Sequence, residues 1–136
     1  MDIDDALQFL RDNHRSVLIT RKRDGSPQAS PVVHGVDGAD RVVISSRQPA
    51  YKVRNLGRDP RVTLCALNDG FFGKWVTIDG TAEILGLPGA MDGLVGLYRQ
   101  VAGEHPDWDD FRAVMVREHR VIIAVTPERA GPDRAA

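Results

Sequence analysis

Short segments rich in valine, isoleucine and threonine, separated by tight-turn residues, constrain the fold of this chain more than any other feature. Residues 16–22, 28–36 and 41–46 are three such segments, and Asp-Gly pairs at 24–25 and 37–38 separate them. Asp-Gly favours a tight turn because glycine adopts positive φ without a clash at Cβ. Short strands joined by turns of this kind predict an antiparallel meander.

The rest of the chain predicts three more strands and four short helices, so the expected fold class is mainly β (α+β). The further strands are expected at residues 61–67, 74–85 and 121–125. The helices are expected at residues 3–10 behind an Asp2 cap, after Pro49, at 87–101 and at 107–118 behind an Asp107 cap. Gly57 is expected to end the second helix, and Gly80 to mark a β-bulge.

The length and composition match one globular domain. The chain has 136 residues, of which 42% are hydrophobic and 27% charged. We expect this domain to cover residues 1–129, and we expect residues 130–136, which are rich in Pro, Gly, Ala and charge, to form a flexible C-terminal tail. The four histidines are not paired at metal-ligand spacing and the single cysteine stands alone, so no metal site is expected.

Charge and segment composition bear on partners and location. The formal net charge of -1 gives no overall attraction to nucleic acid or to an anionic membrane, so neither is an expected partner. The acidic N-terminus lacks the apolar segment of a signal peptide, and no apolar run approaches the roughly 20 residues that span a bilayer. One cysteine, Cys65, excludes an internal disulfide, which fits a cytoplasmic location.

The segment of residues 45–61 is far more basic than the chain as a whole. A single acid, Asp59, stands there among five basic residues: Arg47, Lys52, Arg54, Arg58 and Arg61. Ser45 and Ser46 precede them at the end of an expected strand. Hydroxyls and a helix N-terminus beside Arg and Lys favour phosphate binding, because backbone N–H groups, the helix dipole and side-chain charge act together. A solvated basic helix face explains the same residues, and composition alone does not separate the two.

Pro31 interrupts the second expected strand. Proline cannot donate a hydrogen bond to a strand ladder, so this position requires a sheet edge or a bulge. Such an edge exposes backbone groups to a ligand, but protection against edge-to-edge aggregation is the simpler explanation. Trp75, Trp108 and the pair Phe71-Phe72 can stack on an aromatic ligand, although packing is the more common role of such side chains.

Three stretches together resemble a known family. They are Gly25-Ser26-Pro27 before Ser30-Pro31-Val32-Val33, then Ser45-Ser46-Arg47 before residues 51–56 and 59–62, and finally residues 103–108 before 120–123 and 126–129. In this order they resemble the split β-barrel superfamily that includes pyridoxamine-phosphate oxidase and many flavin-binding relatives. The last stretch is similar to an actinobacterial branch whose members use the deazaflavin coenzyme F420 in place of FMN.

The resemblance implies a fold and an assembly. The fold is a six-stranded antiparallel split β-barrel with short peripheral helices, and the assembly is a homodimer with two cofactor sites in the grooves between subunits. Carried over by position, the residues that hold the cofactor phosphate are Ser45, Ser46, Arg47 and Lys52, with Arg54 in an assisting role.

The resemblance also implies which residues meet the ring of the cofactor. Pro31, Val32 and Val33 are expected to line the tricyclic ring through backbone contacts, and Trp75 is expected to reach the site from the partner subunit. His34 departs from the pattern, since many relatives carry an aromatic or apolar residue there. We therefore hypothesise that His34 contacts the substrate and donates a proton.

The resemblance implies an oxidoreductase that transfers a hydride between coenzyme F420 and a small conjugated organic substrate. The sequence contains no acid–base constellation, and a cofactor that carries the chemistry requires none in principle. Two alternatives stay open: an FMN-dependent oxidase or reductase, and a non-catalytic protein that carries a flavin, a deazaflavin or a haem-like molecule.

Overall fold

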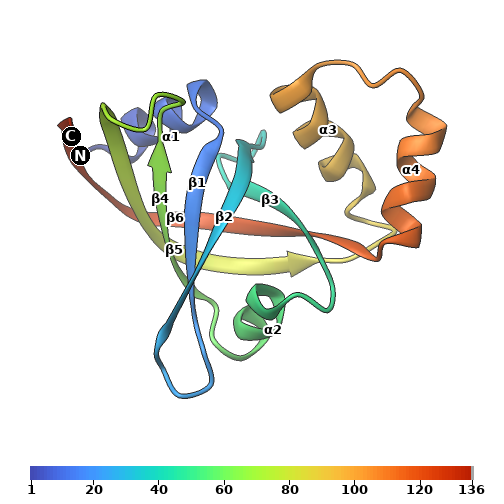
Figure 1. The fold of residues 1–136 in the computed structure, drawn as a ribbon, viewed down its shortest axis with the longest axis horizontal. Coiled ribbons are helices and arrows are strands. Elements are labelled where there is room, and N and C mark those ends of the chain that lie inside the picture. Colours follow the sequence, from blue (N-terminus) through green and yellow to red (C-terminus); the bar gives the residue numbers. More distant parts are fainter. Residues whose placement is uncertain (136) are drawn as a thin grey trace.

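Six antiparallel strands close into a barrel in this computed structural model, which describes residues 1–135 (Figure 1). Around the barrel the strands follow the order β1-β2-β3-β6-β5-β4. The strands are β1 (Arg15–Arg21), β2 (Pro27–Val36), β3 (Val42–Arg47), β4 (Arg61–Leu67), β5 (Lys74–Leu85) and β6 (Arg120–Ala135). The helices are α1 (Ile3–Asp12), α2 (Tyr51–Arg58), α3 (Met91–Ala102) and α4 (Trp108–Arg117). The predicted mainly β, six-stranded antiparallel barrel with peripheral helices is confirmed.

β2 changes partners along its length, and this change opens the barrel on one side. Residues 27–33 pair with β1, whereas residues 34–36 pair with β3. In the described part of the chain, no strand pairs with the other edge of residues 27–33. Pro31 lies in this half-paired stretch, as its missing N–H requires. The predicted edge position of Pro31 is confirmed.

β6 is longer than the sequence predicts. Residues 120–125 pair with β3, residues 122–125 pair with β5 as well, and residues 126–135 continue along β5 alone. The strand therefore extends ten residues beyond the predicted end at Val125 and includes most of the segment 130–136, for which we expected a flexible tail. Pairing with β5 satisfies the backbone groups of this segment, which outweighs its prolines and glycine. Register shifts accommodate the irregular composition, and one of them falls at the predicted bulge at Gly80.

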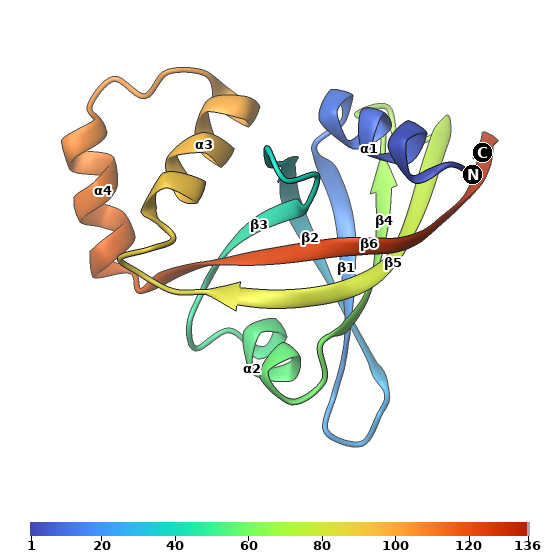
Figure 2. The same cartoon turned by 180° about the vertical axis from the view of Figure 1, so that it is seen from behind.

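Two apolar clusters hold the molecule together. The larger fills the barrel interior, where α1 and α2 contribute Leu7, Leu10, Val53 and Leu56 from opposite ends (Figure 1). The smaller lies between the outer face of the barrel and the pair α3–α4, which stands to one side of the barrel in Figure 2. Burial of this second cluster attaches α3 and α4 to the barrel.

The helix ends follow local chemistry in most cases. Asp2 and Asp107 cap α1 and α4 through their side chains, as predicted. The prediction that Gly57 ends α2 is wrong, because the helix continues to Arg58 and ends where Asp59 adopts an extended conformation. α3 begins four residues later than predicted, since residues 86–90 form turns. Among the described residues, no helix is long and apolar enough to cross a membrane.

Candidate functional site

A groove of about 580 Å³ lies between the half-paired part of the barrel and the helices α3 and α4. It brings together residues from six separate elements: β2, β3, α2, α3, α4 and β6. The predicted site residues among its lining are Pro31, Val32, Val33, Ser45 and Lys52. These residues span the ring-binding and phosphate-binding sets expected from the sequence, and the fold places both sets on one surface.

The polar end of the groove has donors that are not used elsewhere in the fold. Ser45 lies near the end of β3, and Lys52 lies in the first turn of α2. Within residues 1–135, neither side chain makes a hydrogen bond or ion pair that would occupy it. The hydroxyl and the ammonium are therefore available to a ligand.

The start of α2 adds backbone donors to this end. Ala50, the N-cap residue, provides no side-chain cap, and no acidic residue lies in the first turn. The backbone N–H groups of Tyr51 and Lys52 have no partner in the described part of the chain. An uncapped helix N-terminus beside a lysine attracts anions, since its free N–H groups and its dipole both present positive charge.

The floor of the groove is the open edge of β2. Val33 is 51% exposed there, and the side chains of Pro31 and Val33 point away from the barrel interior. The N–H of His34 donates to the carbonyl of His14 on the β1 side. Because backbone groups alternate in direction along a strand, the N–H and C=O of Val33 face away from β1, at the point where the pairing of β2 with β3 begins. A flat ligand on this floor can therefore bond to the backbone of Val33.

The wall opposite the floor is apolar. Its residues come from one face of α3 and the facing side of α4: Leu94, Leu97, Tyr98 and Val101, then Phe111 and Met115. Tyr98 and Phe111 stack edge to face with ring centroids 5.3 Å apart, which makes this part of the wall rigid. The groove therefore combines an anion-binding end with an apolar slot.

Sequence reasoning missed Arg120 and the contribution of α3. Arg120 lines the groove, where its Nε donates to the Glu118 carboxylate at 2.9 Å. The residue lies beside Arg47 only because β6 returns along β3. The apolar spacing of α3 did predict a helix, but spacing alone does not distinguish the side that faces the barrel from the side that faces a groove.

Four of the predicted cofactor-binding residues lie outside the lining of the groove. Ser46 is 3% exposed and alternates with Ser45, so it faces the barrel interior. Arg47 is exposed at the end of β3. Arg54 is exposed on α2, 5.9 Å from the ring centre of Tyr51. Trp75 lies at the start of β5, paired with Leu67. The groove of a single chain thus includes only part of the predicted set.

The interpretation of His34 as a substrate contact is wrong. Its side chain is 0% exposed, inside the barrel beneath α1. Nε2 donates to the carbonyl of Leu10 at 3.1 Å, and the Ser16 hydroxyl lies 2.8 Å from Nδ1, where it donates when the imidazole is neutral. Burial lowers the pKa of His34 to about 4, which keeps the ring neutral. His34 therefore fastens α1 to β1 and β2 and has no access to the groove.

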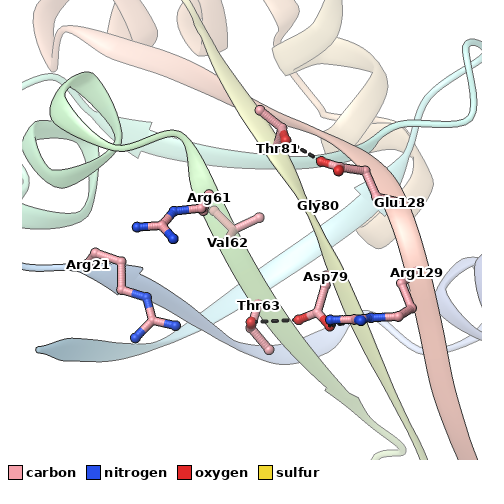
Figure 3. Close-up of a pocket in the computed structure, with 9 residues that line it drawn as sticks. All are labelled: Arg21, Arg61, Val62, Thr63, Asp79, Gly80, Thr81, Glu128 and Arg129. Atoms are coloured by element: carbon pink, nitrogen blue, oxygen red, sulfur yellow. Dashed lines mark hydrogen bonds and ion pairs between the residues drawn. The ribbon is translucent and has the colours of Figure 1, made fainter. Parts of the chain in front are cut away.

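A second pocket, on the outer face of β4, β5 and β6, has the opposite character (Figure 3). Asp79 accepts from the Thr63 hydroxyl at 2.7 Å and from Arg129 at 3.0 Å, and these bonds lower the pKa of Asp79. Thr81 donates to Glu128, and Arg61 pairs with Asp59 at the rim. Arg21 also lines this pocket and makes no side-chain hydrogen bond or ion pair within residues 1–135, whereas Arg61 and Arg129 are each paired with an acid.

Metal chemistry finds no support in the described residues. Among residues 1–135, no group of three or more His, Cys, Asp or Glu side chains could hold a metal ion. Cys65 is partly buried on β4, and burial raises the pKa of its thiol. A thiol with a raised pKa is a poor nucleophile.

A comparison with protein families identifies the fold family. The model of the pyridoxamine 5'-phosphate oxidase family matches residues 3–132 of this chain. The chain belongs to that family. The match includes the β2 edge, the end of β3 and the start of α2, which are the elements that build the groove.

Solved structures share the fold of this family member at low sequence identity. A conserved hypothetical protein of Mycobacterium tuberculosis superposes with a TM-score of 0.79 at 21% identity, covering 100% of this chain and 92% of the other. An F420 reductase has a TM-score of 0.70 at 22% identity, covering 91% and 94%. The haem storage protein HutZ of Vibrio cholerae has a TM-score of 0.74 at 15% identity, covering 100% and 98%. At these identities the likeness supports the fold alone.

Proposed function

We propose that this chain is an oxidoreductase that binds coenzyme F420 in the groove and transfers a hydride between the coenzyme and a small conjugated organic substrate. The observation that carries the proposal is the combination of an unpaired lysine, a free hydroxyl and an uncapped helix N-terminus at one end of an apolar slot. A phosphate-bearing tricyclic molecule has the complementary shape and chemistry.

The residues present fit such a cofactor. Ser45, Lys52 and the N–H groups at the start of α2 would hold the phosphate. The backbone of Val33 and the apolar wall of α3 and α4 would hold the ring. When bound, the deazaflavin supplies a hydride-transfer centre, which is chemistry that no side chain of this groove provides.

The contribution of the chain is therefore binding and orientation. The floor and the wall hold a flat ring in one plane, and the apolar side chains exclude water from the face that meets the substrate. The same side chains favour an uncharged conjugated substrate, because burying a charge against Leu97, Tyr98 and Phe111 would cost desolvation energy without a paired countercharge.

A second copy of the chain is part of the proposal. The groove is open along the unpaired edge of β2, and Trp75 of the same chain lies outside its lining. In a homodimer the Trp75 of a second copy would cover the ring. Size measurement in solution tests the dimer, and Trp75→Ala tests the contact, since a partner contribution predicts weaker cofactor binding without loss of the dimer.

Two other ligands, FMN and haem, stay in consideration. FMN carries the same phosphate and a similar tricycle, so the groove fits it by the same argument. The similarity to a haem storage protein favours a carrier role as the second candidate function. A carrier would bind its ligand tightly and reduce no acceptor.

Side-by-side titration of the purified protein with F420, FMN and haem is the decisive experiment. We expect F420 to bind most tightly, and the reduced coenzyme to lose its electrons to a quinone or enone acceptor in the presence of the protein. Tighter binding of FMN, with turnover, would replace F420 by the flavin. Binding of haem alone, without reduction of any acceptor, would overturn the enzyme proposal.

A further inference from the structure

The helix α3 approaches β2 at a single glycine, Gly35. A Cβ atom added at Gly35 would lie 2.7 Å from Oε1 of Gln100 and 2.9 Å from Cδ1 of Leu97. Both distances are shorter than real Cβ contacts, so any larger residue would push the helix or its side chains outward. Gly35 is two residues from Val33, on the same outer face of β2. This tight contact between α3 and β2 therefore lies at the edge of the groove floor.

Gln100 fastens α3 at the same place. Its Oε1 accepts from the N–H of Val36 at 2.7 Å, and its Nε2 donates to the C=O of Val36 at 2.8 Å. These two backbone groups face the side of β2 on which β1 has already ended, since the pairing of β1 begins at Arg15↔Val33. The carboxamide thus replaces a neighbouring strand, because it offers one donor and one acceptor at the spacing of a peptide group.

The close packing at Gly35 and the hydrogen bonds between Gln100 and Val36 are coupled. Oε1 of Gln100, the atom nearest to a Cβ at position 35, is also the atom that accepts from Val36. It cannot move away without losing that bond. Leu97, the second close neighbour, lines the groove and is 8% exposed. A change at Gly35 or Gln100 therefore reaches the groove wall through one helical turn of α3.

We propose that Gly35 and Gln100 are positioning residues that set the distance between α3 and β2, and hence the width of the ring-binding slot. The effect of this width on cofactor affinity rests on the proposed function, whereas the width itself does not. Neither residue touches the cofactor in this proposal. They hold the wall that does.

The width is measured with spin labels on cysteines placed at Val33 and Val101, which line opposite sides of the groove and are 51% and 37% exposed. The background carries Cys65→Ser, and labelled protein is diluted with unlabelled protein to remove distances between subunits. We expect a narrow distance distribution in the parent. Gly35→Ala and Gly35→Val should lengthen the mean distance in order of side-chain size, and Gln100→Met should broaden it.

Matched controls separate this effect from general destabilisation. Gly38→Ala makes the same substitution near the end of β2, where an added Cβ meets nothing within 4 Å. Gln8→Met makes the same change on α1, where Gln8 bonds only to exposed Asp12. Both should leave the distance unchanged. An unchanged distance in Gly35→Val and in Gln100→Met would overturn the proposal, and Gln100→Met serves alone if the glycine variants do not fold.

The variant Gln100→Glu adds a rescue test. A carboxylate repels the C=O of Val36, whereas a carboxylic acid again offers one donor and one acceptor. The broadened distribution at neutral pH should therefore narrow toward the parent at about pH 5 or below. The ionisable side chains of Asp37, Arg41 and Asp92 line the adjoining cavity together with Gln100, so the parent protein at each pH is the reference. No narrowing would contradict the role of the carboxamide.

Cofactor affinity tests the consequence of the width. With F420 or FMN as the probe, we expect Gly35→Val and Gln100→Met to weaken binding by about tenfold, since a displaced wall loses apolar contact with the ring. A changed distance between the spin labels with unchanged cofactor affinity would show that Gly35 and Gln100 set the width without affecting cofactor binding. Failure of the unsubstituted protein to bind either probe would reject the proposed function. The distance measurement would still decide whether Gly35 and Gln100 set the width of the groove.

Discussion

The groove beside β2 and the pocket on β4, β5 and β6 both contain charged side chains, but the two sites differ in how completely these charges are paired. In the pocket of Figure 3, Asp79 is bonded to Thr63 and Arg129, and Arg61 is bonded to Asp59. In the groove, Lys52 lies beside an uncapped helix start, and no acid accepts from it within residues 1–135. Counting charges does not identify a binding site. What marks the groove is an unpaired charge that lies beside the free backbone N–H groups of a helix start.

The largest expected effect concerns His34, which lies beneath the groove floor and not in it. The folded state holds its pKa at about 4, below the ordinary 6.5, so the unfolded chain takes up the proton first as pH falls. Stability should be constant above pH 6.5 and should decrease by about 3 kcal/mol as pH falls to 4. Urea unfolding across this range measures the decrease.

His34→Gln keeps a donor for the carbonyl of Leu10 and removes the titrating group, so its unfolding free energy should change less over the same range. An NMR titration of the His34 ring gives the pKa directly. A titration midpoint near 6.5 would show that the ring is accessible to solvent. It would restore the hypothesis that His34 contacts the substrate.

The second expected effect is a loss of cofactor affinity, which distinguishes the groove from the pocket of Figure 3. Lys52→Ala should weaken cofactor binding by about 1.5–3 kcal/mol, or about 10- to 150-fold, because a charge-assisted bond to phosphate is lost. Calorimetric titration with F420 and FMN measures the loss. Lys22→Ala removes the same charge from the exposed turn between β1 and β2 and should leave affinity unchanged. Equal affinity of the Lys52 variant and the parent would mean that this lysine is only a solvated charge.

The third effect tests the pocket of Figure 3. Asp79→Ala should lower the free energy of unfolding by about 1 kcal/mol, since it removes the acceptor of Thr63 and a partly exposed ion pair with Arg129. Cofactor affinity should not change. A loss of affinity without a loss of stability would mean that this pocket, and not the groove, binds the ligand.

The smallest expected effect is on cofactor affinity, and it distinguishes the roles of two basic residues of α2. Arg54 and Lys52 belong to the same basic segment, but Arg54 faces solvent beside Tyr51. Arg54→Ala should change cofactor affinity by no more than about twofold, the size of an exposed contact. A larger loss would extend the phosphate site along α2.

Local signals predicted the elements that local chemistry determines. The Asp-Gly turns, the cap at Asp107 and the edge position of Pro31 depend on residues near in sequence, and each was predicted. The length of β6 was not, because Pro127, Gly131 and Pro132 disfavour a strand locally and only pairing with the distant β5 compensates for them. Local preference is a weak guide where tertiary pairing decides.

The candidate site was predictable in part for the same reason. Ser45 and Lys52 are close in sequence, so their juxtaposition follows from one strand end and one helix start. The burial of His34 was also readable, since side chains alternate along a strand and His34 shares the inward phase of Val32 and Val36. The wall from α3 depends on the contact at Gly35, and no pattern within the helix reports that contact.

The strand that closes the barrel, β6, follows the other five described strands in the sequence, and this order bears on synthesis. Until β6 emerges from the ribosome, β1 to β5 form at most an open sheet whose two outer strands, β3 and β5, have no neighbour on one side. Exposed edges of this kind recruit strands from other molecules. A nascent chain stalled before residue 120 is therefore the species that chaperones would need to protect, and β6 removes that hazard when it pairs with both β3 and β5.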